Sequence, residues 1–290
     1  AAVSAVLHEL RRFTLPPIDP TLTISEVRSG YKVWKERTST SPSGLHLGHQ
    51  KTILQVEPSD NLDQDDLATS YFRVMAAQLT LAARSGKPLQ RWNTIATTVI
   101  PKTPGNTNID KQRMLQIPES DANLCFGILW GRKLLYHALG FSALNDEQWG
   151  TRPGRSAIDV VFLKHLTYNL FHLTHTGGGT FDNDAKSCYD RIVLSLAILR
   201  SHQLGLPSST CTLLESFLSQ LQYHLRTSHG LSTKYYSTQD GTYLHGPGQG
   251  SREGPCLWLL VSTLAMDSMR YGASPISFSN PNRTRISQRH

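Results

Sequence analysis

The sequence predicts an α+β fold, in which long helices accompany two β-hairpins. Three observations predict it. Apolar residues recur at helical spacing in several long segments, two pairs of short segments flank glycine-containing turns, and 39% of the 290 residues are hydrophobic. A chain of this length and hydrophobicity can bury a substantial core. We expect three ranges, namely a mostly helical region at 1–90, a second unit at 91–175 and a third at 176–290.

The helical segments are identified by their spacing and their ends. Residues 67–85 carry apolar side chains at helical spacing, follow an acidic stretch that can cap a helix, and stop at Gly86 and Pro88. Further helices are expected from Ser120 or Asp121 to Gly140, from about Ser156 onward, over 192–204, over 211–222, and from Pro255 to about 269.

A β-hairpin is predicted where residues 94–100 alternate in polarity, residues 101–108 form a Pro/Gly/Asn loop and residues 112–117 return. Lys102 and Arg113 stand at its two shoulders. Two cations on a hairpin suit a phosphate clamp, because lysine offers a point charge and arginine a planar fork. An ordinary solvated hairpin is the alternative. A second hairpin is predicted over 222–237, turning near Gly230.

The segment FDNDAKSCYDRI, residues 181–192, holds three carboxylates. In a strand, Asp182 and Asp184 would project from the same face, because side chains alternate with a period of two. Two acids on one face are typical of a metal site. The alternative is a polar strand end that leads into a helix, where aspartate is favoured as a cap.

Two loops carry further candidate binding residues. Arg152, Gly154 and Arg155 form a basic turn in front of a predicted helix, where a nucleic-acid phosphate could be held. Considered alone, this segment is equally an ordinary loop. Glycines around Gln249 would allow a ligand to approach the backbone closely, although the GxxxxGK[ST] pattern of a P-loop is absent.

Composition limits the partners and the compartment. A net charge of +7 and a pI near 9.3 fit a polyanionic partner. The four cysteines are too far apart for a CxxC pair and too few for a disulfide framework, so we expect an intracellular protein, nuclear or cytoplasmic. The sequence contains no run of 18 apolar residues, so we expect no membrane partner. Both ends are expected to be cut, since the chain starts at Ala1 without methionine.

The order of these signals, from Lys102 to Met269, resembles the fingers and palm of reverse transcriptases, most closely those of non-LTR retroelements and group II introns. IPK, the glycine loop and Arg113 are similar to the fingers hairpin, and QWGTRPGRSAID is similar to a QxGFRPGRST-like stretch of that family. DAKSCYDRI matches its first palm motif, and GPGQGSREGP resembles its second. The resemblance implies a right-hand polymerase fold, with fingers at 91–175, a partial palm at 176–290 and a helical N-terminal extension at 1–90.

The resemblance also implies roles for residues in catalysis. Asp184 would be the catalytic, metal-binding aspartate, and the carbonyl of Ala185 together with Asp182 would complete the ligands for Mg²⁺ or Mn²⁺. Lys102 and Arg113 would grip the triphosphate of a dNTP. The reaction implied is transfer of that nucleotide to a primer 3′ hydroxyl.

Other residues would position the substrates. Tyr189 would lie under the sugar and exclude a 2′ hydroxyl, which disfavours an RNA-directed RNA polymerase. Gln249 and Gly250 would border the template base and the incoming nucleotide. The basic turn that contains Arg152, Gly154 and Arg155 would contact phosphates of the RNA template or the DNA primer.

One departure from the family pattern matters. The third palm motif, an aromatic residue followed by an xDD hairpin, is absent, and Asp267 is the only acid after Gly254. We therefore expect an inactive fragment that lacks palm and thumb segments of its parent protein. Two alternatives remain open. One is a degenerate or domesticated domain that binds nucleic acid without catalysis, and the other is a metal-dependent nuclease or phosphatase that uses Asp182, Asp184 and Asp190.

Overall fold

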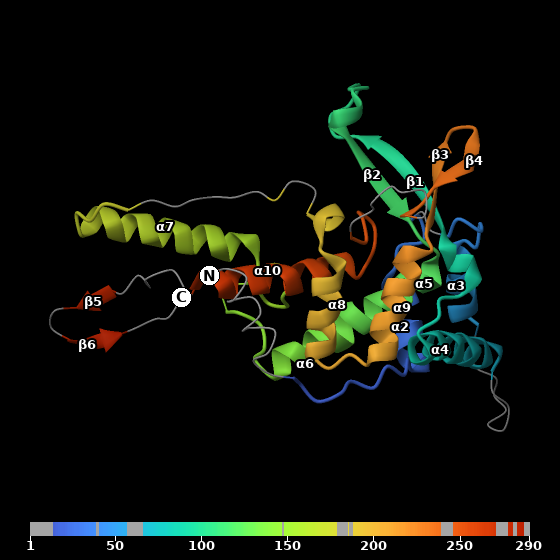
Figure 1. Cartoon of the computed structure of the whole chain (residues 1–290), viewed down its shortest axis with the longest axis horizontal. Coiled ribbons are helices and arrows are strands. Elements are labelled where there is room, and N and C mark those ends of the chain that lie inside the picture. The colour runs from blue at the N-terminus through green and yellow to red at the C-terminus, as the bar shows by residue number, and fades with distance from the viewer. Residues whose placement is uncertain are drawn as a thin grey trace.

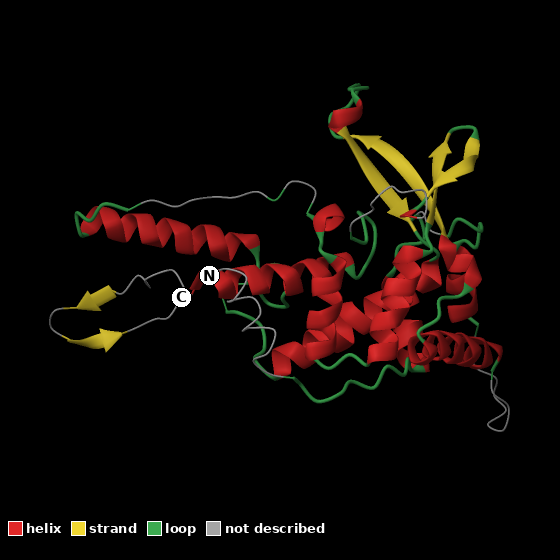
Figure 2. Ribbon diagram, in the orientation of Figure 1, coloured by secondary structure: helices red, strands yellow, loops and turns green. Residues whose placement is uncertain are grey.

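The computed structural model describes residues 14–38, 41–56, 66–146, 148–178, 185, 188–238, 246–270, 278–280 and 283–286. Within these ranges the α+β prediction is confirmed, because a helical body carries a four-stranded mixed sheet (Figures 1 and 2). No helix of the described residues is both long enough and apolar enough to cross a membrane.

The elements follow one another along the chain in this order. The N-terminal part contains α2 (Ile24–Val33), α3 (Leu47–Leu54), α4 (Leu67–Ser85), η1 (Gln90–Asn93), β1 (Thr94–Pro101), η2 (Ile109–Lys111) and β2 (Gln112–Ile117). The middle contains α5 (Ser120–Ile128), the π-helix η3 (Leu129–Leu134), α6 (Leu135–Gly140) and α7 (Ala157–Leu173). The C-terminal part contains η4 (Tyr189–Arg191), α8 (Leu194–Gln203), α9 (Ser208–Ser219), β3 (Gln222–Thr227), β4 (Gly230–Tyr236), α10 (Gly254–Arg270), β5 (Phe278–Asn280) and β6 (Arg283–Ile286).

Both predicted hairpins are confirmed, and they belong to one sheet with the order β2-β1-β3-β4. Strands β1 and β2 are antiparallel, with Ile100 opposite Arg113, and β3 and β4 are antiparallel as well. Strands β1 and β3 are parallel, with Thr94 opposite Gln222. The sheet therefore takes strands from both the 91–175 and the 176–290 ranges. A separate two-stranded hairpin is formed by β5 and β6.

A single hydrophobic core joins the helical body from Ile18 to Leu260. Its centre is aromatic, because the rings of Phe126 and Phe217 lie 4.7 Å apart and Trp130 packs 5.7 Å from Phe126. Burying rings of this size is a major source of folding free energy. The core fixes α5, η3 and α9 beneath the sheet and so holds the base of β1 and β3 in place.

Local signals set most helix ends. Asp66 caps α4, and Gly86 ends it in the left-handed conformation at φ 72°. Ser156 forms a capping box with Asp159 at the start of α7. The expected cap of α5 is wrong, since Glu119 occupies that position. The Glu119 side chain makes no bond to the start of α5 and instead accepts hydrogen bonds from the backbone N–H and the hydroxyl of Ser43. Asp121 instead turns inward and binds Arg91 and Trp92.

Helix α7 differs from the other long helices, because none of its seventeen residues is buried. Its apolar side chains are spread around the helix and stay accessible, with Ile158 at 79% and Phe162 at 60% exposure. In Figure 1, α7 extends to the left, away from the four-stranded sheet. A helix that is apolar on all sides is normally buried.

Candidate active site

The β1–β2 hairpin presents one face to a cleft of about 480 Å³. Thr98 and Leu115 are paired across β1 and β2, and both line this cleft. Arg113 is paired with Ile100, the next lining residue along β1. Because side chains of directly paired residues project from the same face of a sheet, Arg113 lies on the cleft side.

Lys102 lies just beyond β1, where its backbone N–H donates to the carbonyl of Lys111 at 3.0 Å. The side chains of Lys102 and Arg113 are both exposed. Among the described residues, no carboxylate lies within ion-pair distance of either cation. Neither cation is paired with an acid in the described part of the chain, and phosphate binding by this pair remains a prediction.

The turn that contains Gln249 and Gly250 is attached directly to β2. The backbone N–H of Gln116 donates to the carbonyl of Gln249 at 2.7 Å, and Leu115 forms a parallel bridge with Gln249. The amide of Asn123 donates to the carbonyl of Gly250 at 3.2 Å. Asn123 also accepts from the backbone N–H of Arg252, so α5 and β2 together fix the turn.

The glycines of this turn pack closely against β2. A Cβ at Gly250, where φ is 119°, would lie 2.2 Å from the carbonyl oxygen of Gln116. A Cβ at Gly248 would lie 2.0 Å from the Gln116 side chain. The sequence predicted a close approach of the backbone to a ligand. The close approach in the structure is to β2, and it leaves Gly250 at the edge of the cleft.

Tyr189 lies on η4 beside the same glycine-rich segment. A Cβ at Gly254 would lie 3.5 Å from Cδ1 of the Tyr189 ring, and one at Gly246 would meet the Tyr189 carbonyl. The ring is half-buried, and burial raises the pKa of its phenol. Tyr189 is outside the set of residues that line the cleft, so it faces the glycine turn from another side.

Of the three predicted metal ligands, the structure describes only Ala185. Asp182 and Asp184 lie outside the described residues, together with the strand expected for them, while Ala185 is exposed. Asp190 is on η4, as expected for a residue beyond that strand, and burial raises the pKa of its carboxyl. Among the described residues, no group of three His, Cys, Asp or Glu side chains is arranged to hold a metal.

The basic turn at 152–155 is held by its own residues. Arg152 is 12% exposed and donates to the carbonyls of Asn145 and Gln148. Arg155 is 3.5 Å from the Asp146 carboxylate and lies 4.8 Å over the Trp149 ring. Gly154 has a φ of 73° and closes the turn. These contacts favour the interpretation of a self-supporting loop, and contact with nucleic acid remains a prediction.

No protein-family model matches the chain, and no curated protein matches it. The functional argument therefore depends on the residues and on their arrangement.

Two residues beside the cleft were missed by sequence reasoning. Arg252 stacks its guanidinium 3.8 Å over the Trp34 ring, and burial lowers its pKa. Both residues line the cleft. Glu253, which follows Arg252 in the sequence, is fully buried, and burial raises its pKa to about 7. Because Trp34 is distant in the sequence, no local pattern could have identified the stacked pair.

Proposed function

We propose that this chain contains the fingers and part of the palm of a reverse transcriptase with a right-hand polymerase fold. Its reaction would be RNA-directed addition of dNTPs to a primer 3′ hydroxyl. One observation carries the proposal. The hairpin that bears Lys102 and Arg113 and the turn that bears Gln249 and Gly250 are joined through β2 at a single cleft.

The roles of these residues follow from their chemistry. Lys102 and Arg113 bind the triphosphate, since charge-assisted bonds to phosphate are the strongest that these side chains make. The Gln249 and Gly250 backbone supports the base pair from the side of β2. Tyr189 borders the glycine-rich turn from outside the residues that line the cleft, and its role in selecting deoxynucleotides is proposed on the resemblance alone.

The chemical step is assigned to the first palm motif. Asp184 is proposed to hold Mg²⁺ or Mn²⁺ together with Asp182 and the carbonyl of Ala185. All three provide oxygen ligands, which suit these ions. Such ions activate a primer hydroxyl and stabilise a leaving pyrophosphate. Within these 290 residues no second acidic motif accompanies Asp184, so the isolated chain is expected to bind nucleotide without extending a primer.

Nucleotide binding tests this proposal directly. A fluorescent dNTP should bind the chain with an annealed RNA template and DNA primer. Lys102→Ala or Arg113→Ala should each raise its Kd about tenfold, because hydrogen bonds to charged groups contribute roughly 1.5–3 kcal/mol. Lys87→Ala is the matched control, since Lys87 is exposed and lies at the end of α4. Equal Kd values for all four proteins would contradict the phosphate clamp.

Sugar selection gives a second readout. The chain should bind the dNTP more tightly than the corresponding NTP, and Tyr189→Ala should reduce that difference. Unchanged discrimination in Tyr189→Ala would remove the role of this ring.

A non-catalytic nucleic-acid-binding domain of polymerase fold is the second candidate. It is favoured by the net charge of +7. In that case the chain should bind RNA but not the dNTP. Lys102→Ala and Arg113→Ala should then have no effect in the dNTP assay. Primer extension by the isolated chain would instead contradict our expectation of inactivity.

A further inference from the structure

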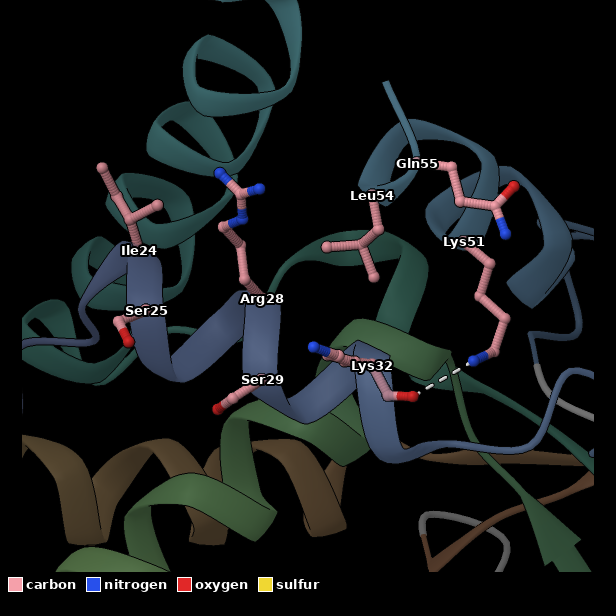
Figure 3. A pocket seen from close by; sticks show the side chains of 8 residues that line it. All are labelled: Ile24, Ser25, Arg28, Ser29, Lys32, Lys51, Leu54 and Gln55. Atoms are coloured by element: carbon pink, nitrogen blue, oxygen red, sulfur yellow. Dashed lines mark hydrogen bonds between the residues drawn. The ribbon is translucent and has the colours of Figure 1, made fainter. Parts of the chain in front are cut away.

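A basic hollow of about 720 Å³ opens between α2 and α3, on helices that the proposed nucleotide site does not use. Figure 3 shows it from close by. Its polar lining consists of Ser25, Arg28, Ser29 and Lys32 from α2, Lys51 from α3, and Gln55, which follows the last residue of α3. Three of the six are cations. Arg28 already donates to the Thr69 hydroxyl of α4 at 3.4 Å, and the Ser29 hydroxyl donates to the Glu26 carbonyl, so Lys32 and Lys51 are the main donors left for a ligand.

The cations of the hollow have no acidic partner in the part of the chain that the structure describes. Among the described residues, no carboxylate lies within ion-pair distance of Arg28, Lys32 or Lys51. Lys51 reaches across from α3 and donates to the Lys32 carbonyl at 3.2 Å (Figure 3). An ammonium carries three donors, so Lys51 keeps two for a ligand while its position is fixed.

Helical geometry separates this basic face from the acid of α2. Arg28 and Lys32 are four residues apart, which places them one above the other on one side of the helix. Glu26 precedes Arg28 by two residues, which is about 200° around the helix. Its carboxylate binds Lys133 of η3 at 3.2 Å and the N-terminus of α2. Among the described residues, the lining of the hollow therefore carries positive charge and no acid.

The lining favours phosphate oxygens over other anionic partners. Serine hydroxyls and a glutamine amide beside lysine and arginine are the side chains that typically contact nucleic-acid backbones. Ile24 and Leu54 are the apolar side chains among the described lining residues, and no aromatic ring that could serve as the buried anchor of a protein interface lines the hollow. The hollow is concave and lies between two helices, whereas an anionic membrane would need a projecting surface.

The hollow and the cleft flank the same end of α2. Lys32 lines the hollow, and Trp34, two residues further on, lines the cleft beneath Arg252. We propose that the hollow binds phosphodiester groups of a single-stranded nucleic acid whose neighbouring nucleotides occupy the cleft. This inference rests on the proposed function, and it assigns a strand-binding role to α2 and α3.

Salt-dependent binding to the full 290-residue chain tests it. The probe is a fluorescent, unstructured single-stranded RNA of about 15 nucleotides, near the upper end of one single-strand site. Anisotropy is measured between about 50 and 200 mM KCl. Lys32→Glu and Lys51→Glu should each weaken binding about tenfold and reduce the slope of log K against log salt by about 0.7 or more. Lys87→Glu, an equal charge change on exposed surface, should change binding much less.

Three results would overturn the inference. Equal losses in Lys32→Glu and Lys87→Glu would mean that only net charge matters. Full competition by millimolar inorganic phosphate would identify a small-anion site. Binding to phosphatidylserine vesicles that depends on Lys32 would identify a membrane site instead.

The result can be separated from the test of the proposed function. In a chain that carries Lys32→Glu, Lys102→Ala should still raise the Kd of the dNTP about tenfold. The reason is that Lys102 belongs to the hairpin, whereas Lys32 belongs to α2. If the strand inference fails, the dNTP response persists. If the proposed function fails, the dNTP response is absent whatever the RNA result.

Discussion

The backbone N–H of Gln116 donates a hydrogen bond to the carbonyl of Gln249 at 2.7 Å. This bond joins the β1–β2 hairpin to the glycine-rich turn and extends the sheet by one bridge. The turn can approach β2 so closely because its glycines have no Cβ. The position of Gln249 and Gly250 is therefore fixed by β2 together with Asn123 of α5.

Gly250→Ala should destabilise the protein strongly. Its φ of 119° is unfavourable for a residue with a side chain, and the new Cβ would lie 2.2 Å from the Gln116 carbonyl. We expect a loss of more than about 2 kcal/mol in the free energy of unfolding, at the upper part of the range for a strained backbone. Urea unfolding measures it.

Gly105→Ala is the matched control. Gly105 also has a positive φ, of 78°, but an added Cβ would meet nothing within 4 Å. Its cost should be about 1 kcal/mol, from the left-handed backbone alone. Equal losses for the two variants would show that the contact with Gln116 contributes nothing.

Glu253 should make stability depend on pH. Burial raises its folded pKa to about 7, above the ordinary 4.5, so the folded protein binds this proton more tightly than the unfolded chain. The stabilisation is complete below the unfolded pKa and is lost as pH rises through the folded pKa. Between about pH 5 and pH 8 the free energy of unfolding should fall by up to about 3 kcal/mol from this group.

Glu253→Gln should remove this contribution, because the amide stays neutral at both ends of the range. The measurement is the difference between variant and parent in urea unfolding at the two pH values. Glu215→Gln, on the exposed side of α9, is the control and should leave the profile unchanged. If the free energy of unfolding depends on pH in the same way in Glu253→Gln and in the parent, this carboxyl is not protonated in the folded protein at the lower of the two pH values.

Much of the fold could be predicted because the relevant signals are local. Gly86 ends α4 in the left-handed conformation, as expected from a glycine after an apolar helix. The β1–β2 hairpin follows from alternation around a Pro/Gly loop. Such features depend on residues a few positions apart, and the sequence contains them directly.

The rest depends on contacts between distant segments. The parallel pairing of β1 with β3 joins residues 94–98 to 222–226, and no short pattern encodes it. The stacking of Arg252 on Trp34 is equally non-local. Asp121 illustrates the competition that results, because a residue suited to a helix cap is buried instead, where Arg91 and the Trp92 indole stabilise its charge.

Arg91→Ala should therefore cost about 3 kcal/mol. It would leave Asp121, which is 2% exposed, as a buried charge with only the indole N–H as a side-chain donor, and removing one partner of such a pair is strongly destabilising. Arg84→Ala, which breaks the exposed pair with Asp19, should cost less than about 1 kcal/mol. Thermal unfolding compares the two, and similar losses would show that burial of Asp121 does not matter.

Helix α7 should be insensitive to polar substitution on its own surface. Phe162 is 60% exposed and α7 has no buried residue, so Phe162→Glu should change the free energy of unfolding by no more than about 0.5 kcal/mol. Phe126→Ala, in the core, should cost about 3–5 kcal/mol. Because exposed apolar surface favours association, Phe162→Glu should also reduce self-association in sedimentation velocity. A loss above about 1 kcal/mol in Phe162→Glu would instead show that α7 packs against another part of the chain in solution.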